Sequence, residues 1–439
     1  MKLGRLLALF GWTLPVFAQY AGPAILSRGE APAAMSAPEI KFRPFVEFGI
    51  GYETELSGVA VTDAQGDLPN ANSYGMNLSW GVSGTHSWRH TKLGLSYRGG
   101  LSHYPQQSGY DGLDQSMLLG ITHRISRHVT LSVRESAGMF TRAFGLGGLA
   151  QTVPFDPSQS YIPTTDFFDN RTYYLSTQAD LTIQKTARLS FDLGGDDFLT
   201  RYRAAGLIGT NGLGARADVQ YRLSRRSTIG AAYNFEHFAY RGDYGATDVH
   251  GFAGTFARAI SARLEFSASV GASRIEQKFI QSVPVDPVIA ALLGVSSTTE
   301  IGHFVAWIPS GSVRASRVFR EGVLYVSAGR SATGGNGLFT TSYTTDVSSG
   351  YAYTGIRRWS LGAHVAYDRS TSVAIFKGHY NSASGGFSAS RQLLRYVHLV
   401  VGYDARSYSS MDFHNYNRLV QDVHAGLGFT PGEVPLRIW

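Results

Sequence analysis

The feature that most constrains the fold is a two-residue alternation of side chains that recurs along the chain. In the segment 73–85, Tyr74, Met76, Leu78, Trp80 and Val82 alternate with small or polar residues. Successive side chains of a strand point to opposite faces, so this segment predicts a strand with one apolar and one polar face. When such strands repeat along a whole chain, the pattern is typical of a transmembrane β-barrel whose apolar face contacts lipid.

The connections between these segments alternate between short and long. Eight tight connections, most of which carry a basic residue, are predicted at 88–90, 126–128, 185–187, 224–226, 261–262, 320–322, 357–358 and 394–395. Nine longer, irregular segments lie between them, at 57–72, 105–112, 142–170, 201–211, 241–247, 277–302, 331–342, 370–375 and 407–416. Together they predict an all-β, antiparallel barrel of about eighteen strands with both termini in the periplasm; sixteen strands is the alternative count.

The two ends of the chain differ from the repeating part. Residues 1–18 have the basic start and short apolar stretch of a secretory signal peptide, and this stretch is too short for a spanning helix. Residues 19–41 lack a period and predict a periplasmic extension or, alternatively, a small plug in the lumen. The barrel is predicted over 42–430, and 431–439 is a C-terminal tail. Either Phe429 or Trp439 could carry the aromatic insertion signal.

Composition narrows the class of protein further. The formal net charge is +7, but the basic residues are spread along the chain rather than gathered on one element. A nucleic-acid-binding protein concentrates its positive charge, so we expect no nucleic-acid partner. Cysteine is absent, which excludes disulfides and thiolate metal sites.

With its alternating strands, alternating connections and aromatic residues near strand ends, the chain resembles a Gram-negative outer-membrane β-barrel of the porin-like kind over residues 42–430. The resemblance implies a place in the bacterial outer membrane, contact with outer-membrane lipid and insertion by the barrel-assembly machinery. No motif indicates a particular porin, exporter or receptor family, so no functional residues are carried over.

The polar faces of the strands predict a water-filled lumen lined by charges of both signs, because charged side chains are costly in lipid. Rings of charge select ions and solutes in pores. The alternative for any single residue is an ion pair across the wall with a neighbouring strand. The candidate pore-lining residues are Arg43, Glu47, Arg98, Arg134, Asp192, Arg216, Asp218, Arg222, Asp404 and Arg406.

Two long segments are candidates for a functional loop. Residues 142–170 form the third outer loop by count, and by analogy with porins it folds inward as a constriction formed by Asp156, Tyr161, Asp166 and Phe168. An exposed cap is the alternative. Within 277–302, residues 286–294 predict a short apolar helix, with an aspartate cap, a proline start and a glycine end.

Diffusion of small hydrophilic solutes through an open channel is the leading functional hypothesis. Export of a polysaccharide and a closed structural or surface-binding barrel are the alternatives, ahead of a barrel enzyme. The sequence predicts no catalytic residue, no cofactor and no metal site, because the spacing of His86 and His90 falls in a hairpin turn, where it has no meaning for metal binding. The transported solute and the oligomeric state are left open.

Overall fold

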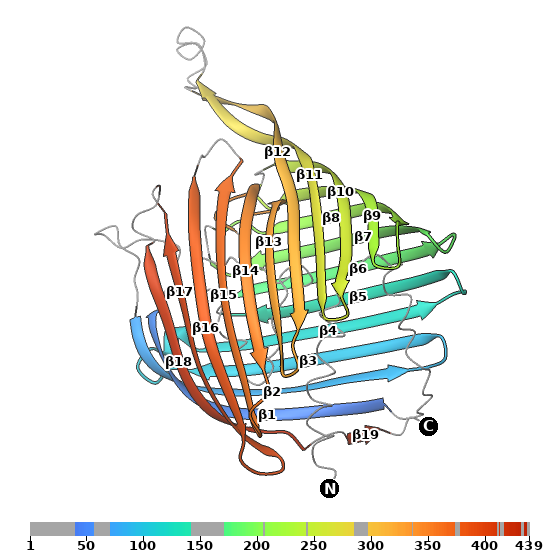
Figure 1. The fold of residues 1–439 in the computed structure, drawn as a ribbon. Coiled ribbons are helices and arrows are strands. Elements are labelled where there is room, and N and C mark those ends of the chain that lie inside the picture. Colours follow the sequence, from blue (N-terminus) through green and yellow to red (C-terminus); the bar gives the residue numbers. More distant parts are fainter. Residues whose placement is uncertain are drawn as a thin grey trace.

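Eighteen antiparallel strands form one closed barrel in the computed structural model of the protein (Figure 1). The barrel closes where β1 (Ile40–Leu56) pairs with β2 (Ala71–Ser87) along one edge and with β18 (Arg418–Phe429) along the other. The all-β fold and the preferred count of eighteen strands are therefore confirmed. The structure describes residues 40–56, 71–141, 171–204, 207–242, 245–284, 297–335, 337–373, 378–410, 412, 417–431 and 434–436.

Each remaining strand pairs with the strands before and after it in the chain. Their bounds are β3 (Thr91–His103), β4 (Gly112–Arg124), β5 (Val129–Phe140), β6 (Thr172–Gln184), β7 (Leu189–Tyr202), β8 (Thr210–Arg222), β9 (Ser227–Tyr240), β10 (Ala246–Ser261), β11 (Leu264–Pro284), β12 (Ser297–Val318), β13 (Gly322–Thr333), β14 (Ser342–Tyr353), β15 (Trp359–Ser372), β16 (His379–Gln392) and β17 (Val397–Ser409). A 3-10 turn, η2 (Ser108–Tyr110), precedes β4. No helix among these residues is long and apolar enough to cross a bilayer.

The pairing register gives the wall two chemically distinct faces. Phe48 of β1 lies opposite Leu78 of β2 and Leu427 of β18, and all three side chains are exposed on the outside of the barrel. The next residue along β1, Glu47, points inward and is only 4% exposed. An apolar outer wall and a polar inner wall are what a barrel needs to stand in a bilayer around a wet interior.

The two rims of the barrel differ in the length of their connections. We call the rim with the eight short connections the turn end and the opposite rim the loop end. The strands reach a few residues into several of the predicted loops, as at Ala71 and Ser409.

The prediction of an irregular segment over 277–302 is wrong for most of its length. β11 continues to Pro284 and β12 begins at Ser297, with an unbroken antiparallel register between them. This hairpin extends past the neighbouring strands at the loop end (Figure 1). Outward polar residues such as Glu276 and His303, 2.7 Å apart, alternate there with apolar ones such as Ile301, so the outer face of this hairpin is mixed and its sequence lacks a clean period. The helix predicted over 286–294 lies outside the described residues.

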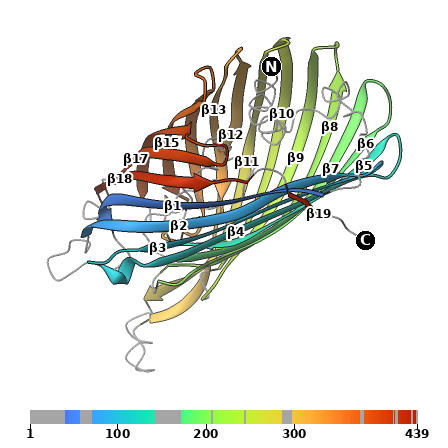
Figure 2. The same ribbon diagram turned by 90° about the horizontal axis from the view of Figure 1, so that it is seen from below.

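The C-terminal tail adds a short strand to the barrel seam. β19 (Val434–Leu436) pairs with Ile40–Phe42 at the start of β1, directly beyond the part of β1 that pairs with β18 (Figure 2). The first and last described strands, β1 and β19, therefore meet at the turn end. The signal peptide predicted over 1–18 lies outside the described residues, as does the part of the predicted extension before Ile40.

The two faces of β2 predict opposite tolerance to charge. Leu78→Arg places a guanidinium in the lipid-facing wall and should destabilise the folded barrel by about 2–4 kcal/mol near the bilayer midplane. Ser79→Arg is the matched control, because Ser79 points inward between Glu47 and Gly100. Urea unfolding from lipid vesicles measures both variants. Equal destabilisation would contradict the assignment of the faces.

Candidate functional site

All ten predicted lumen residues lie on the inward face of their strands, but they do not form one site. Arg43 and Arg222 lie at the turn end, and Arg222 Nε donates to the backbone oxygen of Ser224 at 3.0 Å. Arg98 lies over the ring of Phe45, 5.7 Å from its centre, and interacts with the charge of Glu47. Arg134 stands apart on β5 and is exposed to the lumen.

Asp192, Arg216 and Asp218 belong to a denser group on β6–β9. We call Asp180, Asp192, Asp196, Asp218 and Glu236 the acidic wall, because these five carboxyl groups face the lumen around the single guanidinium of Arg216. Arg216 Nη2 donates to Asp180. Thr182 donates its hydroxyl to Asp192 at 2.5 Å. The acidic wall therefore places five carboxyl groups and one guanidinium on this part of the inner wall.

Glycines on the adjacent strands give these charged side chains room along the wall. Gly194 lies between Asp180 and Arg216 in the cross-strand register, and any side chain there would collide with both. Gly214 lies opposite Asp196, and a side chain there would collide with the carboxyl group of Asp196. The ion pair therefore lies flat against the wall instead of extending into the lumen.

The β13–β14 connection folds into the barrel. We call residues 334–335 and 337–341 the inward loop. The hydroxyl of Thr341 lies 2.7 Å from that of Tyr240 on β9 and 2.6 Å from that of Thr247 on β10. Thr210 on β8 donates its hydroxyl to the backbone oxygen of Gly334 at 3.2 Å. Strands β8 to β10 are not neighbours of β13 or β14, so the loop reaches them only through the interior.

A buried apolar cluster holds the inward loop in place. Its buried members are inward side chains of β7, β9, β10, β11 and β12: Phe198, Phe238, Tyr240, Val249, Ile275 and Ile308. Partly buried residues pack around them. On the other side of the loop, Phe339 stacks on Tyr380 of β16, with ring centres 5.8 Å apart. Apolar residues on an inner wall need cover from water, and the inward loop supplies it at the loop end.

Two glycines of the inward loop have backbone conformations that other residues rarely adopt. Gly335 has φ +84° and Gly337 has φ +87°. A Cβ at Gly335 would collide with the backbone oxygens of Phe339 and Thr340, and one at Gly337 would meet the ring of Tyr202. The loop can therefore turn back into the lumen and approach β7 only because these positions are glycine.

From the sequence, no role is predicted for the inward loop, and the constriction is predicted over 142–170. The segment 331–342 was predicted only as an outer loop, although its glycine-rich start followed by Leu338 and Phe339 is the signal that marks it. The residues of the predicted constriction, Asp156, Tyr161, Asp166 and Phe168, lie outside the described residues.

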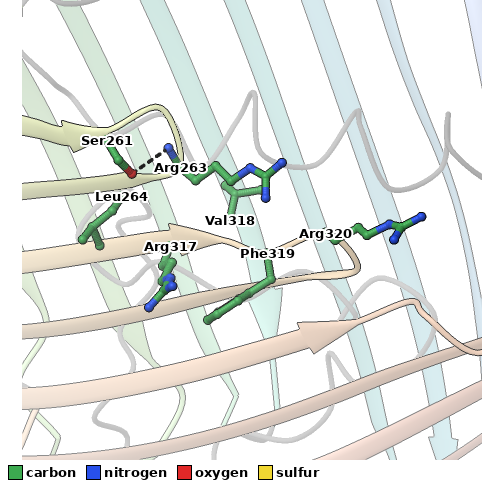
Figure 3. Close-up of a pocket in the computed structure, with 7 residues that line it drawn as sticks. All are labelled: Ser261, Arg263, Leu264, Arg317, Val318, Phe319 and Arg320. Carbon is green, nitrogen blue, oxygen red and sulfur yellow. Dashed lines mark hydrogen bonds between the residues drawn. The ribbon is translucent and has the colours of Figure 1, made fainter.

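A shallow recess lies at the turn end, between the β10–β11 and β12–β13 connections (Figure 3). Arg263, Arg317 and Arg320 line it, and the Arg317 guanidinium stacks on the ring of Phe319 at 4.8 Å. Basic and aromatic side chains are typical of a membrane interface. The recess is at the opposite rim from the inward loop.

A closed barrel with an apolar outer wall and a charged interior is the architecture of an outer-membrane porin. The chain folds as a closed, porin-like β-barrel. No known protein family matches its sequence, and no curated protein does.

Several solved structures are similar to this chain. Pseudomonas aeruginosa OccK2 (OpdF), in complex with glucuronate, has 10% identity and a TM-score of 0.42, with 90% of this chain and 98% of that chain covered. Pseudomonas aeruginosa OpdK, with vanillate, has 12% identity and a TM-score of 0.40, covering 90% and 99%. A BenF-like porin from Pseudomonas fluorescens Pf-5 has 11% identity and a TM-score of 0.41, covering 89% and 98%. At these identities the likeness concerns the fold alone.

The packing of the inward loop can be tested with a cysteine reporter, since the chain has no cysteine of its own. Val249→Cys places a thiol where the native side chain is 1% exposed, so its reaction with a maleimide should be slow. Adding Gly335→Ala should displace the loop and accelerate labelling at this site. Ser132→Cys, an inward position on β5, serves as the control and should label equally in both backgrounds. Unchanged labelling of Val249→Cys would contradict the role of Gly335.

Proposed function

We propose that this protein is an outer-membrane channel for small hydrophilic solutes, with a preference for cations. The observation that carries the proposal is the acidic wall, in which five carboxyl groups share one arginine on the inner face of β6–β9. Fixed charge of one sign inside a narrow, low-dielectric passage raises the local concentration of the opposite charge.

In this proposal, size selection occurs at the loop end. The inward loop occupies part of the cross-section there, so a solute passes beside it before it reaches the acidic wall. Residues 142–170 remain a predicted constriction. The turn end faces the periplasm and the loop end faces outward, which is the arrangement expected from short periplasmic turns and longer outer loops.

A closed barrel is the second candidate, and one observation favours it. The inward loop is fixed by hydroxyl contacts to β8–β10 and by aromatic stacking on β16. Contacts on two sides of the interior would suit a loop that seals the barrel. Conductance separates the two candidates, because a sealed barrel passes no current.

Ion selectivity tests the acidic wall directly. In a planar bilayer with a KCl gradient, the mature chain, residues 19–439, should give stepwise conductance and a reversal potential that favours K⁺. Asp196→Asn should reduce this preference, since Asp196 faces the lumen. Asp197→Asn removes the same charge from the outer face of the same strand and should leave the preference unchanged. Folded, inserted protein without conductance would overturn the proposal in favour of a closed barrel.

Shortening the inward loop tests its part in size selection. Deletion of residues 335–340 removes Phe339 and its stacking on Tyr380, so single-channel conductance should rise. Gel migration with and without heating checks that the deleted variant still folds into a barrel. A folded variant with unchanged conductance would show that the narrowest point lies elsewhere.

A further inference from the structure

Four side chains with metal-binding atoms gather on the inner wall of β15, β17 and β18. We call His364, Asp404, Asp422 and His424 the His–Asp cluster. Ligand atoms of Asp404, Asp422 and His424 all lie within 4.8 Å of one another. His424 Nδ1 is 2.9 Å from Asp422 Oδ2, and His364 Nε2 is 3.4 Å from Asp404 Oδ1.

The register explains how side chains from strands that are not adjacent come together. His364, Gly386 and Asp404 lie opposite one another on β15, β16 and β17. A Cβ at Gly386 would collide with both the His364 ring and the Asp404 carboxylate. His424 lies opposite Gly402, where a Cβ would likewise collide with the imidazole. The two glycines therefore leave a space in the wall that imidazole and carboxylate groups fill together.

The two carboxylates in this cluster face each other directly. Asp404 and Asp422 form a cross-strand pair, and each side chain is only 11% exposed. Like charges directly opposite one another on adjacent strands are destabilising, and more so when water is excluded. Arg406 follows on the same face of β17, but its charge also acts on Asp368. A cation held between Asp404 and Asp422 would remove the repulsion.

The chemistry of the donors indicates which cation fits. The three ligand atoms that lie close together are one imidazole nitrogen and two carboxylate oxygens, and the His364 imidazole lies next to Asp404. Nitrogen and oxygen donors together suit zinc and similar divalent transition metals, whereas calcium and magnesium prefer oxygen donors alone. His364 is 44% exposed and would give a metal ion access from the lumen.

We propose that the His–Asp cluster binds one divalent transition-metal ion of the zinc class. The ion would join β17 to β18, the strand that closes the barrel against β1. The site does not depend on the proposed channel function, because a closed barrel could hold the same ion.

Calorimetry with ZnCl₂ tests the site on the refolded mature chain in detergent, after treatment with EDTA. One Zn²⁺ per chain should bind, and a large excess of Mg²⁺ or Ca²⁺ should not displace it. His424→Gln and Asp404→Asn should each weaken binding at least about 10-fold, since loss of a supporting group alone costs that much. His398→Gln is the matched control, because His398 is an inward histidine on β17 outside the cluster.

Absence of saturable Zn²⁺ binding would overturn the proposal, and so would variants that bind like the native chain or equal binding of Mg²⁺. A second measurement uses the native chain only, so it does not depend on whether the variants fold. Zn²⁺ should protect His364 and His424, but not His398, from diethyl pyrocarbonate, as read by peptide mass spectrometry. Equal modification of all three histidines with and without Zn²⁺ would contradict the site. Neither measurement uses conductance, so its result is separate from that of the channel proposal.

Discussion

The hydrogen bonds of the backbone are the constraint on which the rest of this structure depends. In the hydrocarbon region no water can satisfy an unpaired peptide group, so strands can cross only as a closed sheet. The pairing of β1 with β18 meets this requirement, and β19 extends the seam at the turn end. Closure also separates an outside from an inside, and the alternation of side chains then gives lipid-facing Phe48 and lumen-facing Glu47 on one strand.

The inner face is shaped by glycine as much as by charge. Gly194 and Gly386 lie between charged partners from the strands on either side, and in each case a Cβ would collide with them. Long charged side chains can therefore lie along the wall and meet across an intervening strand. Glycine on the intervening strand allows an arginine–carboxylate pair at Arg216 and a histidine–carboxylate pair at Asp404. The two regions differ in the basic residue that faces the carboxylate, so they have different chemistry on the same backbone arrangement.

The sequence was sufficient for the barrel, the strand count and the inward or outward direction of the charged residues, because a two-residue period leaves no other choice for strands in lipid. It was insufficient where inward side chains are apolar and buried rather than facing water. Val249 is apolar but points inward, and its neighbour His250 is polar but points outward, so the two-residue period breaks within β10. Both follow from long-range placement: Val249 lies beneath the inward loop, and His250 lies on the loop-end part of the outer wall. His364 and Asp404 approach each other because of the pairing register across β16, and a single sequence does not reveal that register.

The inward loop and the acidic wall lie on some of the same strands, the loop near the loop end and the acidic wall closer to the turn end. On β7, Asp192 and Asp196 face the lumen below Phe198, which packs beneath the loop. A rigid loop would then fix the width of the passage directly above the region that sets its charge. Displacing the loop should therefore alter conductance more than ion preference, whereas neutralising Asp196 should do the reverse. If one change altered both properties equally, size and charge selection would have to occur at a single level of the lumen.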